Sequence, residues 1–290
     1  MPSRAVWCDD VVAWWKTSRS SPSRSVRPGA PGAASGREIT RTAVLGQAPP
    51  TFVLGTTSTG DVLAFRAAAQ DLVAWWHRLR AEHPTTGLWP VLLGDGPGDL
   101  CAALPGAVRD DYDPAAELVR AHGMSLADLR ALRAQRLAQY ADLGGDDSFR
   151  DDEDDDALAM VEPDALARYE ATFTAARTDG LVALVPAAHA WQVPVLLGWD
   201  GGLNYDLEPV DHAVVLRDWQ ERFGAQLVTL GNEQVLELWV DHPPTDPAQA
   251  LAVAREQFEY CYDSVYQGVG SLTELARDQV GSQSWYFWWD

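Results

Sequence analysis

The first regular pattern of apolar and polar residues along the chain begins near Thr51. Two short apolar segments, 51–55 and 61–65, flank the sequence TTSTG, whose residues are typical of tight turns. Two such segments around a turn favour a β-hairpin. A helix is expected next, because apolar residues recur there at helical spacing before HPTTG ends the pattern. These residues are Leu72, Val73, Trp76 and Leu79.

Two more helices are expected at 114–121 and 125–143. Ser125 precedes the second one and Asp128 follows three residues later, which is the spacing of a capping box. A helix over 163–178 should then lead into LVALV, the first apolar run of the second half that reads as a strand.

The pattern is clearest after residue 209. A helix should begin there, followed by AQLVTL and QVLELWV as two strands of a hairpin joined at Gly231 and Asn232. Thr245 and Asp246 can cap a long helix, and a shorter helix should span 271–280. The long helix carries Leu251, Val253, Phe258 and Cys261 on its apolar side.

The aromatic segment WYFWW at 285–289 predicts a final strand. Alternation places Trp285, Phe287 and Trp289 on one face, and Tyr286 with Trp288 on the other. A strand of this kind either is buried on both faces or covers a groove, and burial in the core is favoured.

These elements predict an α+β fold, with a small sheet that includes a β-hairpin and is packed by several helices. Residues 1–47 are expected to be a disordered extension, because their Ser, Arg, Pro and Gly content cannot build a core. Residues 48–145 should form an N-terminal α/β region and 161–290 a C-terminal α+β domain. The segment 146–160 between them is an acidic linker loop, whose charges repel one another. The word PVLLG occurs twice, at 90–94 and 194–198, and we interpret the echo as chance.

Composition narrows the possible setting of the protein. Three distant cysteines and the lack of a membrane-length apolar run favour a soluble protein in the cytoplasm. The formal net charge is −20, and residues 181–290 alone carry sixteen acidic and four basic residues. Such a surface repels nucleic acid and anionic membranes and attracts basic proteins. We therefore expect neither direct nucleic acid binding nor membrane binding.

Several motifs of known chemistry are incomplete in this chain. GDGPGD at 94–99 lacks the spacing and the lysine of a phosphate-binding loop. In the acidic loop an EF-hand pattern starting at Asp152 lacks its glycine and its bidentate glutamate. The histidines and cysteines lack metal-ligand spacing, and GxSxG is absent. We therefore expect no cofactor and no metal, and we assign no catalytic residue.

The C-terminal part is similar to a known family. The similarity rests on GWDGGLNY at 198–205, the helix starting at Asp211, REQFEYCYD at 255–263 with Gln267 and Gly268, and the terminal SWYFWWD. These segments resemble the bacterial domain-of-unknown-function family numbered 4253 over about residues 181–290. The resemblance implies an α+β arrangement and supplies no activity, substrate or catalytic residue.

The same region supplies the candidate binding residues. Glycines in the GWDGGLNY turn allow close backbone approach, while Trp199, Asn204 and Tyr205 offer stacking and hydrogen bonds. His212 is a candidate base held by a carboxylate, the alternative being a capping or surface histidine. The full set of candidate binding residues is Trp199, Asn204, Tyr205, Asp211, His212, Asp263 and Gln267.

Two functions of different classes remain. The first is a non-enzymatic, acidic protein-binding module, in its concrete form an immunity-type protein that binds a basic partner. The second is an enzyme of unknown reaction with a carboxylate or histidine site near Trp199 to His212. A pocket with converging titratable groups would favour the enzyme, and an acidic face would favour binding.

Overall fold

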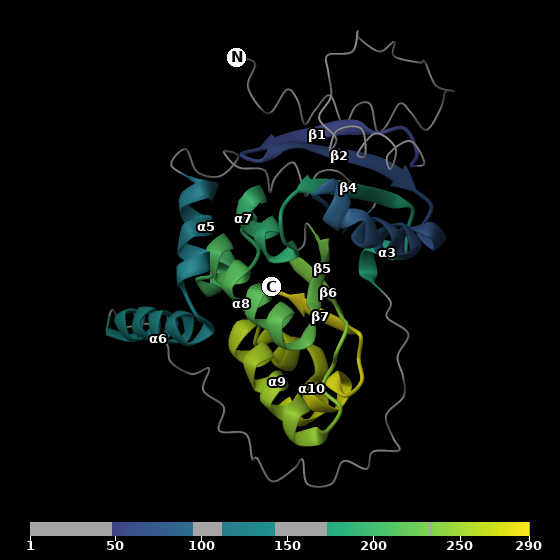
Figure 1. The fold of residues 1–290 in the computed structure, drawn as a ribbon. Helices are drawn as coiled ribbons and strands as arrows, with labels where there is room; N and C mark the ends of the chain where they lie inside the picture. The colour runs from purple at the N-terminus through teal and green to yellow at the C-terminus, as the bar shows by residue number, and fades with distance from the viewer. Residues whose placement is uncertain (1–47, 95–111, 143–172, 232–233, 290) are drawn as a thin grey trace. The chain divides into compact units, whose positions relative to one another are not determined.

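The computed structural model describes most of the chain from residue 48 onward (Figure 1). The described residues are 48–94, 112–142, 173–231 and 234–289. The predicted extension 1–47 and the predicted acidic linker 146–160 lie outside these residues, as do residues 95–99 of the GDGPGD segment.

The fold is α+β, as predicted. Its mixed sheet has seven strands in the order β1-β2-β4-β3-β5-β6-β7. The chain divides into two compact units, and β5 contributes to both. Of the described residues, the first unit comprises 48–94, 112–114, 173–199 and 228–231, and the second comprises 115–142, 200–227 and 234–289.

This grouping differs from the predicted division of the chain into an N-terminal and a C-terminal part. Residues 173–199 join the N-terminal strands, because β4 (Gly180–Pro186) pairs antiparallel with both β2 and β3. Residues 115–142 join the C-terminal region instead, because α6 packs on α8. Sequence order predicted one boundary between an N-terminal and a C-terminal part. Long-range contacts instead group segments from both sides of that boundary into each unit.

The first unit contains the predicted hairpin. The strands β1 (Phe52–Thr57) and β2 (Gly60–Ala67) pair antiparallel, with a register shift between Val53 and Gly55. The helix α3 (Ala69–Thr86) follows and packs on β3. Both β3 and β4 are buried along their whole length, which explains their unbroken apolar sequences.

The repeated word PVLLG adopts two different structures in this unit. Residues 90–93 belong to the strand β3 (Leu88–Leu93), whereas 194–197 belong to the helix α7 (Val193–Leu197). The two copies therefore differ in secondary structure, and the echo carries no sign of duplication.

The helix predicted over 163–178 is wrong at its C-terminal end. Residues 163–172 lie outside the described part, and the chain then forms the short 3-10 turn η4 (Thr174–Ala176) before β4. Phe173 is buried just before this turn. The unit also contains the 3-10 turn η5 (Ala190–Gln192) before α7.

The second unit begins with two helices close to their predicted positions, α5 (Pro114–Gly123) and α6 (Leu126–Asp142). The predicted capping box at Ser125 is present: the Asp128 N–H donates to Ser125 Oγ over 3.1 Å, and the Ser125 N–H donates to Asp128 Oδ2 over 2.9 Å. Two reciprocal bonds satisfy backbone donors that would otherwise lack partners at the start of α6.

The C-terminal pattern was predicted closely. The 3-10 turn η6 (Leu203–Tyr205) and the helix α8 (Pro209–Phe223) lead to the strands β5 (Ala225–Leu230) and β6 (Val235–Val240), which are neighbours in the sheet. Residues 232–233 of their predicted turn lie outside the described part.

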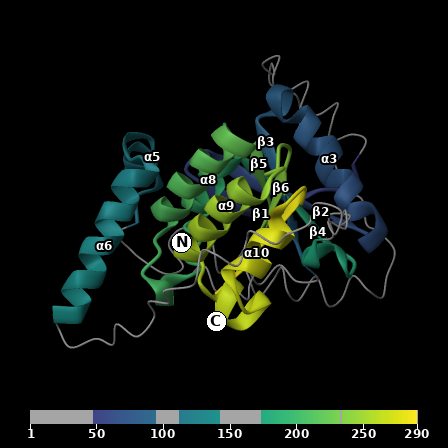
Figure 2. The same ribbon diagram turned by 90° about the horizontal axis from the view of Figure 1, so that it is seen from below.

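Helices and a final strand complete the second unit. α9 (Pro247–Tyr260) begins at the predicted cap Asp246, whose Oδ1 accepts from the Gln249 N–H over 2.9 Å. It is followed by the π-helix η7 (Ser264–Val269), α10 (Leu272–Gln279) and β7 (Ser284–Trp288). α9 and α10 lie side by side (Figure 2), and β7 pairs antiparallel with β6.

The core of the second unit is aromatic. The ring of Trp219 on α8 lies 5.4 Å from those of Tyr260 and Trp285 and 5.3 Å from that of Phe287, measured between centroids. All four side chains are buried. Edge-to-face and stacked contacts of this kind add stability beyond the area buried, so β7 is held to the unit through its inward face.

Candidate functional site

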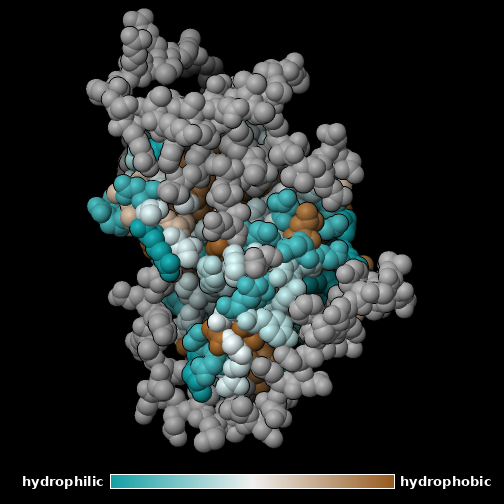
Figure 3. Space-filling model, turned by 180° about the vertical axis from the view of Figure 1, so that it is seen from behind, coloured by the Kyte–Doolittle hydropathy of each residue, from teal (hydrophilic) through white to brown (hydrophobic). Residues whose placement is uncertain are grey.

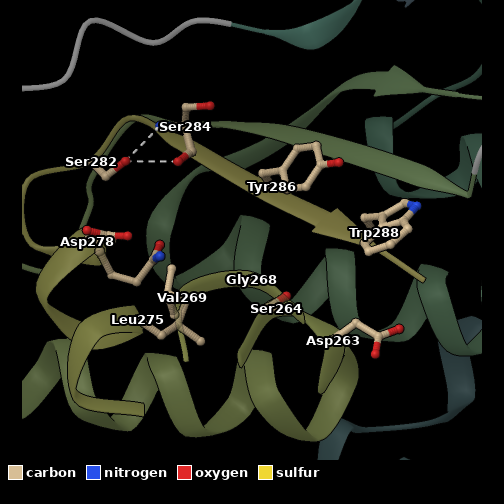
Figure 4. Close-up of a pocket in the computed structure, with 11 residues that line it drawn as sticks. Asp263, Ser264, Gly268, Val269, Leu275, Asp278, Ser282, Ser284, Tyr286 and Trp288 are labelled. Atoms are coloured by element: carbon tan, nitrogen blue, oxygen red, sulfur yellow. Dashed lines mark hydrogen bonds between the residues drawn. The ribbon is translucent and has the colours of Figure 1, made fainter. Parts of the chain in front are cut away.

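A pocket of about 390 Å³ opens beside β7 in the second unit. Its walls come from β7, from the π-helix η7, from α10 and from the turn before β7 (Figure 4). The lining residues are Asp263, Ser264, Gly268, Val269, Leu275, Asp278, Gln279, Ser282, Ser284, Tyr286 and Trp288.

The alternation of β7 creates one wall of this pocket. Trp285 and Phe287 are buried in the aromatic core, while Tyr286 on the other face is 49% exposed and Trp288 is half-buried. Figure 4 shows the Tyr286 and Trp288 side chains on the side of β7 that faces η7. The predicted burial in the core therefore applies to the face of Trp285 and Phe287. The face of Tyr286 and Trp288 borders the pocket instead.

The opposite wall is η7, an uncommon helix with i to i+5 hydrogen bonds that occurs frequently at functional sites. It ends at Gly270, whose φ of 88° is a left-handed conformation that glycine adopts without a steric penalty. Val265 anchors η7 on an apolar cluster with α9 and α10. Val269 of η7 and Leu275 of α10 face the pocket, so this wall has an apolar middle.

A buried carboxylate lies at one end of the pocket. Asp263 is only 3% exposed, and its oxygens accept hydrogen bonds from the Tyr205 hydroxyl and, over 3.0 Å, from Gln267 Nε2. Burial and the bond to Asp263 raise the pKa of Tyr205, so this hydroxyl stays protonated and donates. Three of the seven predicted site residues thus come together at one carboxylate.

A second carboxylate, Asp278, lies at the other end (Figure 4). It is exposed, yet partial burial, followed by the nearby charge of Glu274, raises its pKa above the usual value. Arg277, its neighbour in the chain, forms an ion pair with Glu274. The pocket thus carries negative charge at both ends, and its eleven described lining residues include no basic side chain.

His212 lies away from the pocket, in the closed interior of the unit. Its Nε2–H donates to the Gly201 carbonyl over 2.6 Å, and its Nδ1 accepts from the Tyr260 hydroxyl over 2.5 Å. It has no solvent exposure, and burial lowers its pKa to about 3. His212 is therefore a neutral core residue with both ring nitrogens bonded, and the alternative of a capping or surface histidine is wrong.

Asp211 serves α8 rather than His212. Its Oδ2 accepts from the Glu208 N–H over 3.0 Å and from Arg136 Nη1 over 3.2 Å. The first bond belongs to a capping box with Glu208, and the second fastens α6 to α8. Burial raises the pKa of Asp211. The carboxylate that sequence placed beside a candidate base is thus a structural cap.

The remaining predicted residues, Trp199 and Asn204, do not line the pocket either. Trp199 is buried and belongs to the first unit, and Asn204 is exposed on η6. Gly202 is needed for packing: its φ is 73°, and a Cβ there would lie 2.8 Å from Leu207 Cδ1 and 3.2 Å from Trp289 Nε1. The GWDGGLNY turn accordingly serves close packing, and Tyr205 is its contribution to the pocket region.

Sequence reasoning missed the polar residues at the far end of the pocket. Asp278, Ser282 and Gln279 form no motif, and they meet η7 only because α10 folds back along α9. The available signal was the alternation in β7, which predicted a second face at Tyr286 and Trp288 without indicating what lies opposite.

Two broader classes of site were also considered. Within the described ranges, no group of three or more histidine, cysteine, aspartate or glutamate side chains is arranged to hold a metal ion. Of the helices that the structure describes, none has the length and apolar character needed to cross a membrane.

Comparison with known proteins adds a family and no named activity. Neither a curated protein nor a solved structure matches this chain. One family model matches, over residues 181–290, and this stretch includes every residue that lines the pocket. The matching model is that of the domain of unknown function DUF4253.

Proposed function

We propose that this protein is a non-enzymatic binding module that engages a basic protein partner through its C-terminal region. The observation that carries the proposal is the pocket beside β7, which is lined by the exposed Tyr286 ring, the half-buried Trp288 ring and two carboxylates. Aromatic residues surrounded by complementary charge are typical of the central residues of protein interfaces.

Charge supports the choice of a basic partner. Residues 181–290 carry sixteen acidic and four basic residues, a net charge of −12. A field of this sign accelerates association with basic surfaces and slows it with acidic ones. An immunity-type protein that neutralises a basic nuclease toxin is the concrete form of this proposal.

The enzymatic alternative near Trp199 to His212 receives less support. A general base must reach the proton it removes, whereas His212 is fully buried and Asp211 caps a helix. Asp263 and Asp278 lie at opposite ends of the pocket, and the lining residues that accompany them include no histidine or cysteine.

Affinity capture of the tagged protein from its own cells tests the proposal without any assumption about chemistry. The expected partner is a basic protein, and its association rate should fall by about tenfold or more between 0.01 M and 0.15 M salt, because the Debye length shortens from about 30 Å to about 8 Å. A partner that is acidic, or an association rate indifferent to salt, contradicts the proposal.

A further inference from the structure

The pocket has the features of a receptor for one long cationic side chain. Its middle is apolar and aromatic, formed by Tyr286 and Trp288 on one wall and by Val269 and Leu275 on the other. A carboxylate lies at each end. An alkyl stem with a positively charged head matches this order of groups, because such side chains bury the stem and direct the charge to an acceptor.

The inner carboxylate is already positioned for such a head group. Asp263 is 3% exposed and is held by Tyr205 and Gln267. Each carboxylate oxygen can accept more than one hydrogen bond, and Asp263 is itself one of the residues that line the pocket. A carboxylate fixed in advance and largely removed from water requires less reorganisation when a cation binds.

Aromatic rings favour arginine over lysine at this position. The ring of Trp288 lies at the same end of the pocket as Asp263 (Figure 4). A guanidinium group is planar, so it can stack flat on an aromatic face and pair with a carboxylate through two parallel N–H donors. An ammonium group is attracted to the ring as a point charge but has no planar fork for either arrangement.

The surroundings favour a protein as the source of the cation. The described chain has six exposed large hydrophobic residues, and three of them lie on η7 and β7 around the pocket: Tyr266 at 40%, Val269 at 36% and Tyr286 at 49% exposed. An apolar rim of this kind excludes water from a central charged contact. On the face seen in Figure 3, hydrophobic residues form small separate groups among hydrophilic described surface.

We infer that the pocket between β7, η7 and α10 receives a single arginine side chain of a partner protein, with its guanidinium group on Asp263 and Trp288. The inference rests on the proposed function and specifies the contact through which the basic partner is recognised. Asp278 at the outer end adds attraction for further basic groups next to that arginine.

The direct test uses the purified full chain and capped tripeptides with a central arginine, lysine or citrulline. Citrulline has nearly the shape of arginine without its charge. Fluorine NMR of protein labelled with 5-fluorotryptophan reports on the pocket, and a Trp288→Phe variant identifies the Trp288 signal. We expect the arginine peptide to shift this signal saturably, the lysine peptide to bind at least about threefold more weakly, and the citrulline peptide not to shift it.

Variants locate the site. Asp263→Asn should weaken arginine-peptide binding at least tenfold, while the matched charge control Glu221→Gln, on the exposed part of α8 outside the pocket, should leave it unchanged. If Asp263→Asn fails to fold, Tyr286→Ala provides the same test at a half-exposed position, with Val119→Ala, 73% exposed on α5, as its control.

The outcomes separate this inference from the proposed function. Equal binding of the citrulline and arginine peptides, or no shift at Trp288, overturns the arginine site. Binding of agmatine, a free guanidinium amine, at least tenfold tighter than the arginine peptide overturns the partner as the source. A basic partner that is captured equally by wild type and Tyr286→Ala leaves the proposed function standing and overturns the pocket as its contact.

Discussion

The two faces of β7 use the same kinds of residue for different purposes. On the inner face, Trp285 and Phe287 are each 1% exposed and pack on Trp219 of α8. On the outer face, Tyr286 is 49% exposed and forms a pocket wall with Trp288. Adjacent aromatic residues of one strand thus stabilise the unit on one side and offer rings to a ligand on the other.

The polar groups behind the two faces differ in the same way. His212 and Tyr260, near the inner face, bond to each other and are closed to solvent. Tyr205 and Gln267 hold Asp263 at the edge of an open pocket. A fully buried hydrogen-bonded network stabilises a core, whereas a carboxylate that lines a pocket can also receive a ligand.

Truncating the inner face should give the largest effect on stability. Trp285→Ala should cost about 3–5 kcal/mol of unfolding free energy, since it removes a buried aromatic side chain and leaves a cavity. Tyr286→Ala, one residue further on, should cost no more than about 1 kcal/mol. Urea unfolding followed by circular dichroism measures both values, and similar losses for the two variants would remove the distinction between the faces.

The second-largest effect is expected from acid, which should weaken the buried network of His212 and Tyr260. Burial depresses the pKa of His212 from 6.5 to about 3, so below pH 6.5 the unfolded chain binds a proton that the folded chain does not. The contribution of neutral His212 to the free energy of unfolding is complete above pH 6.5 and declines as the pH falls toward 3. The loss between pH 7 and pH 5 is about 2 kcal/mol.

The measurement is the unfolding free energy of wild type and of a His212→Gln variant at both pH values. Whatever its stability at pH 7, the variant should lose about 2 kcal/mol less on acidification, because all other titrating groups are shared. Equal losses would mean that His212 is able to take up a proton in the folded protein.

Removing the Tyr205 hydroxyl should have a smaller effect on stability, and it should act on the group of Tyr205, Gln267 and Asp263 at the pocket. Tyr205→Phe deletes a donor to Asp263 and should lower stability by about 1 kcal/mol. It should also weaken arginine-peptide binding about threefold, because the Asp263 carboxylate loses a donor that fixes its orientation. Val119→Ala, 73% exposed on α5, is the control. A stability loss with an unchanged affinity for the arginine peptide would assign Tyr205 to structure alone.

Local pattern predicted most elements of this fold and failed where tertiary contacts decide. Caps at Ser125 and Asp246 were recognised because both partners of a cap lie within four residues. PVLLG shows the opposite case, since its first four residues enter a strand in one context and a helix in the other. A short apolar run is compatible with both, and its neighbours in space make the choice.

The candidate site was predicted only in part for the same reason. Alternation in β7 predicted that Tyr286 and Trp288 share a face, because successive side chains of a strand point to opposite faces. The bond between Tyr205 and Asp263 joins residues 58 positions apart and leaves no trace in sequence spacing. Burial likewise decided the role of His212, whose position after Asp211 suggested a reactive pair.

The central claim is that the outer face of β7 binds and the inner face stabilises. It is tested most directly by measuring, on the same samples of Tyr286→Ala and Val119→Ala, the affinity for the captured partner and the unfolding free energy. We predict that Tyr286→Ala loses at least tenfold in affinity while its unfolding free energy stays within about 1 kcal/mol of wild type, and that Val119→Ala changes neither. An unchanged affinity of Tyr286→Ala, or an affinity loss matched by a comparable loss of stability, would contradict the account.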